Sequence, residues 1–127
     1  MKIYLVEDSD LIRERIKAML IGIAGIEICG EQISPIEALQ GISATLPDVV
    51  VTDLQLDGGS GISILEKMPH KDPQIIPIVL TNYATPEFKQ KCIQAGAKYF
   101  FDKTTEFLKL RETIQNLANT NASTSHP

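Results

Sequence analysis

Four charged residues stand at the ends of three short apolar runs that lie far apart in the sequence. Glu7 and Asp8 follow the first run. Asp53 follows a run with three consecutive valines, and Lys103 follows a run rich in aromatic residues. Short apolar runs of this kind are typical of buried parallel strands. Ligands of an open parallel sheet bind outside the carboxyl ends of its strands, so we expect the three carboxylates and the ammonium to share one crevice.

This set of side chains favours a divalent cation together with an anionic phosphoryl group. Carboxylates at neighbouring strand ends repel one another when unpaired. Mg²⁺ relieves that repulsion, because it binds carboxylate oxygens, keeps several waters and contacts phosphate oxygens. Lys103 adds a positive charge for a phosphoryl oxygen, and Thr81, after another apolar run, adds a hydroxyl. A carboxylate can itself accept a phosphoryl group, and Asp53 is the best candidate because its strand is expected to be central.

The loop after the first run is not typical of a nucleotide site. Loops that bind phosphate groups of nucleotides at this place are rich in glycine, so that backbone N–H groups approach the anion. Residues 7–10 read Glu-Asp-Ser-Asp, and three acids would repel a pyrophosphate. The glycines within residues 58–61 do not match the spacing G-x-G-x-x-G. Nucleotide and flavin cofactors are therefore not expected.

Apolar runs alternate with helical patterns five times along the chain. The runs cover residues 2–6, 26–32, 48–53, 75–80 and 98–102. The last helical pattern forms one apolar stripe that consists of Phe107, Leu110, Ile114 and Leu117. Strands that alternate with helices in this way predict right-handed βαβ units. We therefore expect an α/β protein with a doubly wound, three-layer (βα)5 architecture and a five-stranded parallel sheet.

The length of 127 residues is enough for one domain with its own core. We expect this domain to cover residues 1–118 and to be followed by a polar, disordered tail over residues 119–127. The net charge of -4 argues against direct contact with nucleic acid. No apolar stretch approaches the roughly 18 residues that cross a bilayer, and no signal peptide precedes the first strand. We expect a cytoplasmic protein without membrane contact, in which Cys29 and Cys92 are reduced and buried.

In their order on five strand–helix units, the motif residues resemble the receiver domain of bacterial two-component response regulators. The resemblance covers residues 1–117, and the residues that carry it are Glu7, Asp8, Asp53, Thr81 and Lys103. It implies a flavodoxin-like fold with strand order 2-1-3-4-5. It also implies that Asp53 accepts a phosphoryl group from a sensor histidine kinase or a phosphotransfer protein.

The resemblance implies roles for the other site residues. Asp8, Asp53 and the backbone carbonyl of Gln55 would hold Mg²⁺, and Glu7 would act largely through water. Lys103 and Thr81 would bind the phosphoryl group, Phe100 would be an aromatic switch that turns inward, and Asn82 and Tyr83 would tune access to the acceptor. The face that responds to phosphorylation would be the fourth helix, the fifth strand and the fifth helix. These assignments concern Glu7, Asp8, Asp53, Gln55, Thr81, Asn82, Tyr83, Phe100 and Lys103.

Three positions depart from the usual pattern of the family. Asp57 replaces a proline in the loop after the acceptor, and Asn82 replaces a small residue after Thr81. Lys103 is usually followed by proline in a cis peptide bond. Here Thr104 follows, where a cis bond costs several kcal/mol more than it does before proline, so the local backbone geometry stays open.

The leading hypothesis is a stand-alone phosphorylation switch that acts by binding an output protein and turns over no outside substrate. A homodimer that forms on phosphorylation is left open. One alternative is a protein-interaction module that does not use phosphate. Another is the receiver part of a DNA-binding regulator. The charges at residues 13–15 and 89–91 are expected on solvated helix faces.

Overall fold

The computed structural model describes residues 1–124, which form a single five-stranded parallel sheet with helices on both faces. Its strands are β1 (Lys2–Val6), β2 (Glu27–Gln32), β3 (Val49–Thr52), β6 (Ile76–Thr81) and β7 (Tyr99–Asp102). They lie in the order β2-β1-β3-β6-β7, and each neighbouring pair is parallel. Counted along the chain, these five strands have the order 2-1-3-4-5, which confirms the predicted fold and topology.

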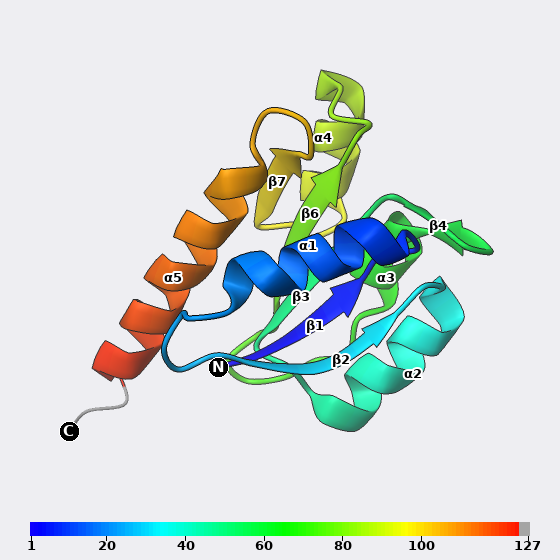
Figure 1. Cartoon of the computed structure of the whole chain (residues 1–127). Helices are drawn as coiled ribbons and strands as arrows, with labels where there is room; N and C mark the ends of the chain where they lie inside the picture. Colours follow the sequence, from blue (N-terminus) through cyan, green and yellow to red (C-terminus); the bar gives the residue numbers. More distant parts are fainter. Residues whose placement is uncertain (125–127) are drawn as a thin grey trace.

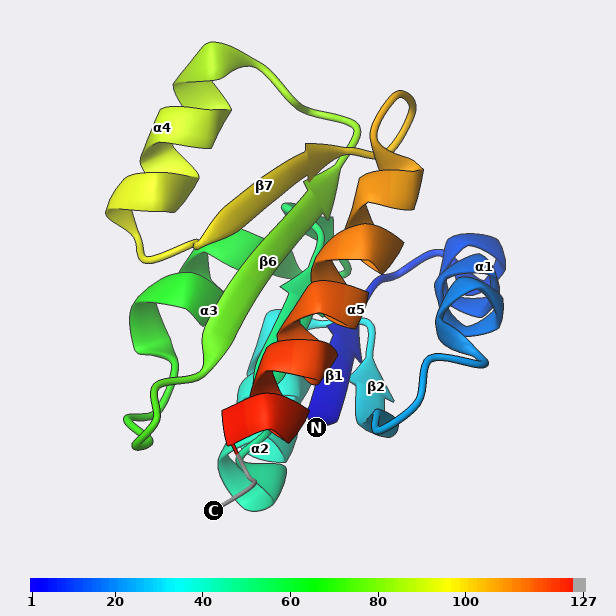
Figure 2. The ribbon, with the colours of Figure 1, turned by 90° about the vertical axis from the view of Figure 1, so that its left-hand side faces the viewer.

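Four helices connect strands, and a fifth follows the last strand (Figure 1). They are α1 (Asp10–Leu20), α2 (Pro35–Thr45), α3 (Gly61–Lys67), α4 (Pro86–Gln94) and α5 (Phe107–Thr124). Helices α1 and α5 cover one face of the sheet, and α2, α3 and α4 cover the other (Figure 2). No helix within residues 1–124 is both long enough and apolar enough to span a membrane.

Each face of the sheet has its own apolar core. Ile16 of α1 and Leu110 of α5 pack on one face, and Ile42 of α2 and Ile64 of α3 pack on the other. The central strand β3 is buried along its whole length. A strand buried on both faces needs no alternation of polar and apolar residues, which explains the run of valines there.

A short hairpin that the sequence did not predict follows β3. Strands β4 (Gln55–Leu56) and β5 (Gly59–Ser60) pair in antiparallel fashion. Gly58, between them, has a φ of 80°, which glycine adopts without steric cost. The hairpin leads directly into α3, so it links the central strand β3 to this helix.

Helices α1 and α4 begin with polar caps near the carboxyl edge of the sheet. The hydroxyl oxygen of Ser9 accepts a hydrogen bond from the Ile12 N–H at 3.2 Å and starts α1 directly after the acidic pair. Thr85 caps α4 in the same way through the Phe88 N–H at 3.2 Å. Such caps contribute about 1 kcal/mol each. They end the preceding loops at fixed points and so fix the lengths of the loops that carry the site.

The last helix is longer than the sequence predicted. Helix α5 continues to Thr124, whereas we expected disorder from residue 119 onward. Its apolar stripe is anchored by Leu110 and Ile114, both fully buried. Extending an anchored helix fixes only one further residue for each hydrogen bond formed, which explains why polar residues continue it. Residues 125–127 of the expected tail lie outside the described part of the chain.

The two cysteines differ in burial, and we expect them to differ in reactivity for that reason. Cys92 is buried and Cys29 is half-buried, and both are free thiols. Burial raises the pKa of Cys92 to about 11, and the thiolate is the form that reacts. We expect iodoacetamide near pH 8 to modify Cys29 in the folded protein and to spare Cys92 until the protein is denatured. Peptide mass spectrometry measures this, and equal modification of both thiols in the native state would contradict the prediction.

Candidate functional site

The candidate site lies where the carboxyl ends of β1, β3, β6 and β7 meet. Thr81 is the last residue of β6, and the acids and the lysine directly follow the other three strands. These four strands are consecutive neighbours in the sheet, so their ends share one edge. The structure therefore brings to one place the residues that the sequence singled out, namely Glu7, Asp8, Asp53, Thr81 and Lys103.

A buried ion triad forms the centre of the site. The Lys103 Nζ atom lies 2.5 Å from Glu7 Oε1 and 2.6 Å from Asp53 Oδ2. The side chains of the three residues are only 7%, 3% and 9% exposed. Buried charges are tolerated when they are paired and hydrogen-bonded, so one ammonium stabilises both carboxylates.

The pKa values of two members of this triad, Glu7 and Lys103, respond differently to burial. Burial raises the pKa of Glu7 above its ordinary value, although hydrogen bonds from Lys103 and the Ser9 N–H act against the rise. Burial acts to lower the pKa of Lys103, but its bonds to Asp53 and Glu7 outweigh that effect and raise it. Lys103 therefore stays an ammonium at neutral pH.

A third carboxylate turns this triad into a candidate metal centre. One carboxylate oxygen each of Glu7, Asp8 and Asp53 lies within 4.8 Å of the others, and Asp8 is exposed to solvent. Three carboxylates beside one ammonium leave an excess of negative charge. Oxygen ligands with that charge fit a hard cation such as Mg²⁺, which keeps waters on its open side.

Neighbouring backbone holds Asp53 in one orientation. The Leu54 N–H donates to Asp53 Oδ1 at 2.6 Å, while Oδ2 faces Lys103. Gly61, at the start of α3, donates its N–H to the Leu54 carbonyl at 2.9 Å. A Cβ atom at Gly61 would overlap with the backbone oxygen of Asp53. The close approach of α3 to the backbone of Asp53 therefore requires glycine at this position.

The two residues expected to tune access are linked to the site in different ways. The Tyr83 phenol donates to the Gln55 side-chain oxygen at 3.0 Å, and the Tyr83 N–H donates to Thr81 Oγ1 at 3.1 Å. Tyr83 thus connects the loop after β3 with the loop after β6. Asn82 lies exposed between Thr81 and Tyr83.

Phe100 lies on β7 and is already buried, with 8% of its surface exposed. It packs in one cluster with Leu54, Leu65 and Val79. The sequence suggested an aromatic side chain that turns inward on phosphorylation. In this structure the side chain is buried, and its role as a switch stays a prediction.

Both loops in which the family usually has proline use the N–H group that proline lacks. The Asp57 N–H donates to the Ile33 carbonyl at 3.1 Å, which ties the hairpin to the loop before α2. The Thr104 N–H donates to Asp102 Oδ1 at 2.7 Å. Within residues 1–124 the cis peptide bond is at Asp72–Pro73, so the Lys103–Thr104 bond is trans. In this chain hydrogen bonds hold the backbone of these loops, whereas a proline would hold it by fixing the angle φ.

Sequence reasoning missed one residue that contacts the site. Arg13, expected on a solvated helix face, donates from Nη1 to the backbone carbonyl of Glu7 at 2.8 Å. Its side chain is only 13% exposed. One feature of the sequence could have indicated this contact. Arg13 lies six residues after Glu7, on the helix that starts at the acidic loop.

Comparison with known proteins agrees with the fold and the acidic site. The model of the response regulator receiver domain matches residues 3–115. The chain belongs to this family, whose general function is phosphorylation of an aspartate. Response regulators receive phosphoryl groups from histidine kinases and act on output partners.

Individual relatives are longer regulators. The chain is 35% identical over 115 residues to the Bacillus subtilis (strain 168) "uncharacterized transcriptional regulatory protein YhcZ", covering 91% of this chain and 54% of that protein. It is 28% identical over 116 residues to the "DNA-binding transcriptional activator DevR/DosR" of Mycobacterium tuberculosis, with coverage of 91% and 54%. A crystal structure of a LuxR-family two-component response regulator from Aurantimonas sp. SI85-9A1 has a TM-score of 0.83 at 26% identity, covering 94% of this chain and 85% of that chain. The chain thus spans about half the length of these two curated relatives.

Proposed function

We propose that Asp53 accepts the phosphoryl group in this receiver and that phosphorylation switches a protein-binding face. The observation that carries the proposal is the double contact of Lys103 with Glu7 and Asp53 at the ends of three strands. It holds a fixed positive charge beside a carboxylate that can act as a nucleophile. Charges fixed in advance stabilise the negative charge that an incoming phosphoryl group brings.

The acidic cluster would hold the cation that accompanies the phosphoryl group. Asp8, Asp53 and the backbone carbonyl of Gln55 would bind Mg²⁺, and Glu7 would act through water. The ion, when bound, neutralises phosphoryl oxygens and orients the donor. Support comes from the three carboxylate oxygens that converge within 4.8 Å.

In the transfer, a carboxylate oxygen of Asp53 attacks the phosphorus atom of a phosphohistidine on a sensor histidine kinase or a phosphotransfer protein. A P–O bond forms as the P–N bond breaks, and the electron pair stays on the imidazole nitrogen, which takes a proton from solvent. Lys103 and the Thr81 hydroxyl donate hydrogen bonds to the phosphoryl oxygens. The product is an aspartyl phosphate.

Phosphorylation would change the surroundings of Thr81. Its hydroxyl oxygen accepts the Tyr83 N–H at 3.1 Å. Movement of the hydroxyl toward a phosphoryl group would alter that bond and shift Tyr83 together with the start of α4. The response would reach the face formed by α4, β7 and α5, where Tyr83 and Phe88 are exposed at the surface.

The experiment is phosphate uptake from acetyl phosphate, followed by intact mass. Wild-type protein is expected to gain one phosphoryl group when Mg²⁺ is present and to gain little without it. The Asp53→Asn variant, which keeps the shape of the side chain but removes the nucleophile, is expected to take up none. Uptake by folded Asp53→Asn at the wild-type rate would contradict the acceptor assignment.

The relatives favour one form of output as a second proposal. The names of two similar proteins describe transcriptional regulators, and the chain matches only about half of each. In this proposal the receiver controls a DNA-binding domain of the same polypeptide. Reading the gene beyond residue 127 tests it, since an in-frame helix-turn-helix pattern would support the proposal and a stop codon would contradict it.

An interaction module without phosphate use is the competing function, and the three departures from the family pattern motivate it. Mg²⁺ affinity distinguishes the two functions. A receiver that uses phosphate binds the ion through its acidic cluster, whereas a module that has lost this use has no need to do so.

A further inference from the structure

We propose that Arg13 is a positioning residue for the candidate metal centre, an inference that rests on the proposed function. Arg13 lies on α1 and touches neither the carboxylate of Glu7 nor Lys103. Its guanidinium instead holds the backbone between the two acids that follow β1. The result is a fixed direction for Asp8, the exposed ligand of the cluster.

Hydrogen bonds hold the backbone of Glu7 on both sides, at its N–H and at its carbonyl. The Glu7 N–H donates to the Gln32 carbonyl of β2 at 3.0 Å, and the Glu7 carbonyl accepts from Arg13 Nη1 at 2.8 Å. The carbonyl of Glu7 and the N–H of Asp8 belong to one planar peptide unit. The hydrogen bond to the carbonyl oxygen of that unit therefore orients the backbone from which the Asp8 side chain projects.

Arg13 is itself fixed by two more acidic residues. Its Nη2 atom lies 2.5 Å from Asp10 Oδ1, and its Nε atom lies 3.3 Å from Glu31 Oε1. The Nε contact is an ion pair without hydrogen-bond geometry. The guanidinium thus joins the acidic loop, the first turn of α1 and the edge strand β2, and its side chain is 13% exposed.

The three contacts require the branched shape of arginine. A guanidinium presents several N–H donors in a rigid, planar fork, whereas a lysine ammonium is a compact charge on a flexible stem. Lysine at this position keeps the charge, but its donors all radiate from one nitrogen, whereas Glu7, Asp10 and Glu31 are each contacted by a different nitrogen of Arg13. The proposal therefore predicts that charge alone does not replace Arg13.

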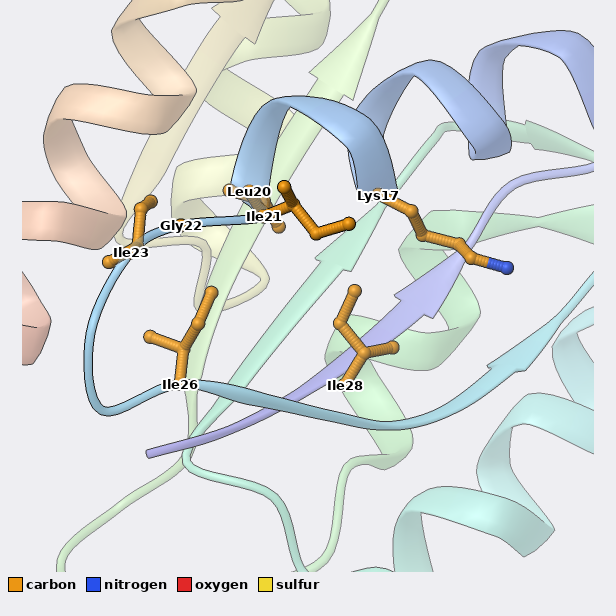
Figure 3. A pocket seen from close by; sticks show the side chains of 7 residues that line it. All are labelled: Lys17, Leu20, Ile21, Gly22, Ile23, Ile26 and Ile28. Carbon is orange, nitrogen blue, oxygen red and sulfur yellow. The ribbon is translucent and has the colours of Figure 1, made fainter.

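Lys17, one turn further along α1, offers a matched comparison. Its Nζ atom lies 3.0 Å from Glu31 Oε2, so it shares an acid with Arg13. Its stem lines a pocket of about 250 Å³ walled mainly by isoleucines, and its ammonium points out of that pocket (Figure 3). The Lys17→Met variant removes the charge, keeps the apolar stem and leaves the Arg13 contact with Glu7 in place.

The test measures Mg²⁺ affinity by calorimetry for the wild type, Arg13→Ala, Arg13→Lys and Lys17→Met. Groups that orient metal ligands typically affect affinity by 10–100-fold, so we expect the Mg²⁺ Kd of Arg13→Ala to rise by about tenfold. Arg13→Lys is expected to show most of this loss, and Lys17→Met is expected to keep the wild-type Kd. The rate of phosphate uptake from acetyl phosphate is expected to fall in Arg13→Ala at low Mg²⁺ and to recover at saturating Mg²⁺.

Two results would overturn the inference alone. One is a wild-type Kd in folded Arg13→Ala, and the other is full rescue by Arg13→Lys, which would reduce the role of Arg13 to its charge. If Arg13→Ala does not fold, Arg13→Lys gives the same comparison. A wild-type protein that binds no Mg²⁺ and takes up no phosphate would contradict the proposed function, and the inference with it.

Discussion

The Lys103→Met variant is expected to lower the free energy of unfolding of the metal-free protein by about 3 kcal/mol. Methionine matches the length of the lysine stem but removes the ammonium that lies within 2.6 Å of both Glu7 and Asp53. Two carboxylates, each less than a tenth exposed, would then face each other without a cation. Leaving a buried charge unpaired is among the costlier single changes in a folded protein.

Urea denaturation in the presence of a chelator measures this loss. Saturating Mg²⁺ is expected to restore part of it, because a cation bound by the acids replaces the missing charge. The control is Lys109→Met, which breaks an exposed ion pair with Glu106 and is expected to cost about 0.5 kcal/mol or less. A Lys103→Met protein as stable as the wild type in chelator would show that the triad contributes nothing to the fold.

The stabilisation by Lys103 also has a predicted pH range. The ion pairs raise the pKa of Lys103 in the folded protein above its ordinary value of 10.5. A raised lysine pKa contributes stability that is fully present below the unfolded pKa and is lost as pH rises through the folded pKa. The difference between the wild type and Lys103→Met is therefore expected to shrink at strongly alkaline pH, as Lys103 loses its proton in the folded wild type.

The Asp8→Asn variant is expected to bind Mg²⁺ at least about tenfold more weakly and to lose Mg²⁺-dependent phosphate uptake in proportion. Asp8 is the exposed member of the three acids, and an amide at this position contributes no negative charge. Its stability in chelator is expected to stay at the wild-type level or above it, because one repelling charge is removed.

Mg²⁺ calorimetry and acetyl phosphate uptake measure the effect of Asp8→Asn. The control is Asp57→Asn, an exposed acid in the neighbouring hairpin whose backbone N–H bond to Ile33 remains intact. This control is expected to leave Mg²⁺ affinity unchanged. Wild-type affinity in Asp8→Asn would exclude Asp8 as a ligand.

The sequence predicted the sheet and the grouping of the acids because both depend on local patterns. Each strand is a short apolar run, and the parallel arrangement places Glu7, Asp53 and Lys103 at one edge without any knowledge of their contacts. The ends of the predicted strands agree with the structure to within one residue for the same reason. Caps such as Ser9 and Thr85 lie next to the residues they fix.

The features that the sequence did not predict depend on contacts between distant segments. The β4–β5 hairpin forms by local pairing, but it is fixed against the rest of the fold by the bond from the Asp57 N–H to the Ile33 carbonyl, which lies far away along the chain. The burial of Phe100 depends on α3 and α4 packing over β7. The charge of Arg13 suggested a solvated residue. Its partner is the backbone carbonyl of Glu7, and every residue has such a group, so the residue types in the sequence do not indicate this contact.

The most direct test of the central claim locates the phosphoryl group on the chain. Wild-type protein treated with acetyl phosphate and Mg²⁺ would be reduced with borohydride, which converts an aspartyl phosphate to homoserine, and then digested and mapped by peptide mass spectrometry. We predict that the conversion occurs at Asp53 and not at Asp8 or Glu7. Phosphorylated protein with an unchanged Asp53 and a converted acid elsewhere would contradict the account.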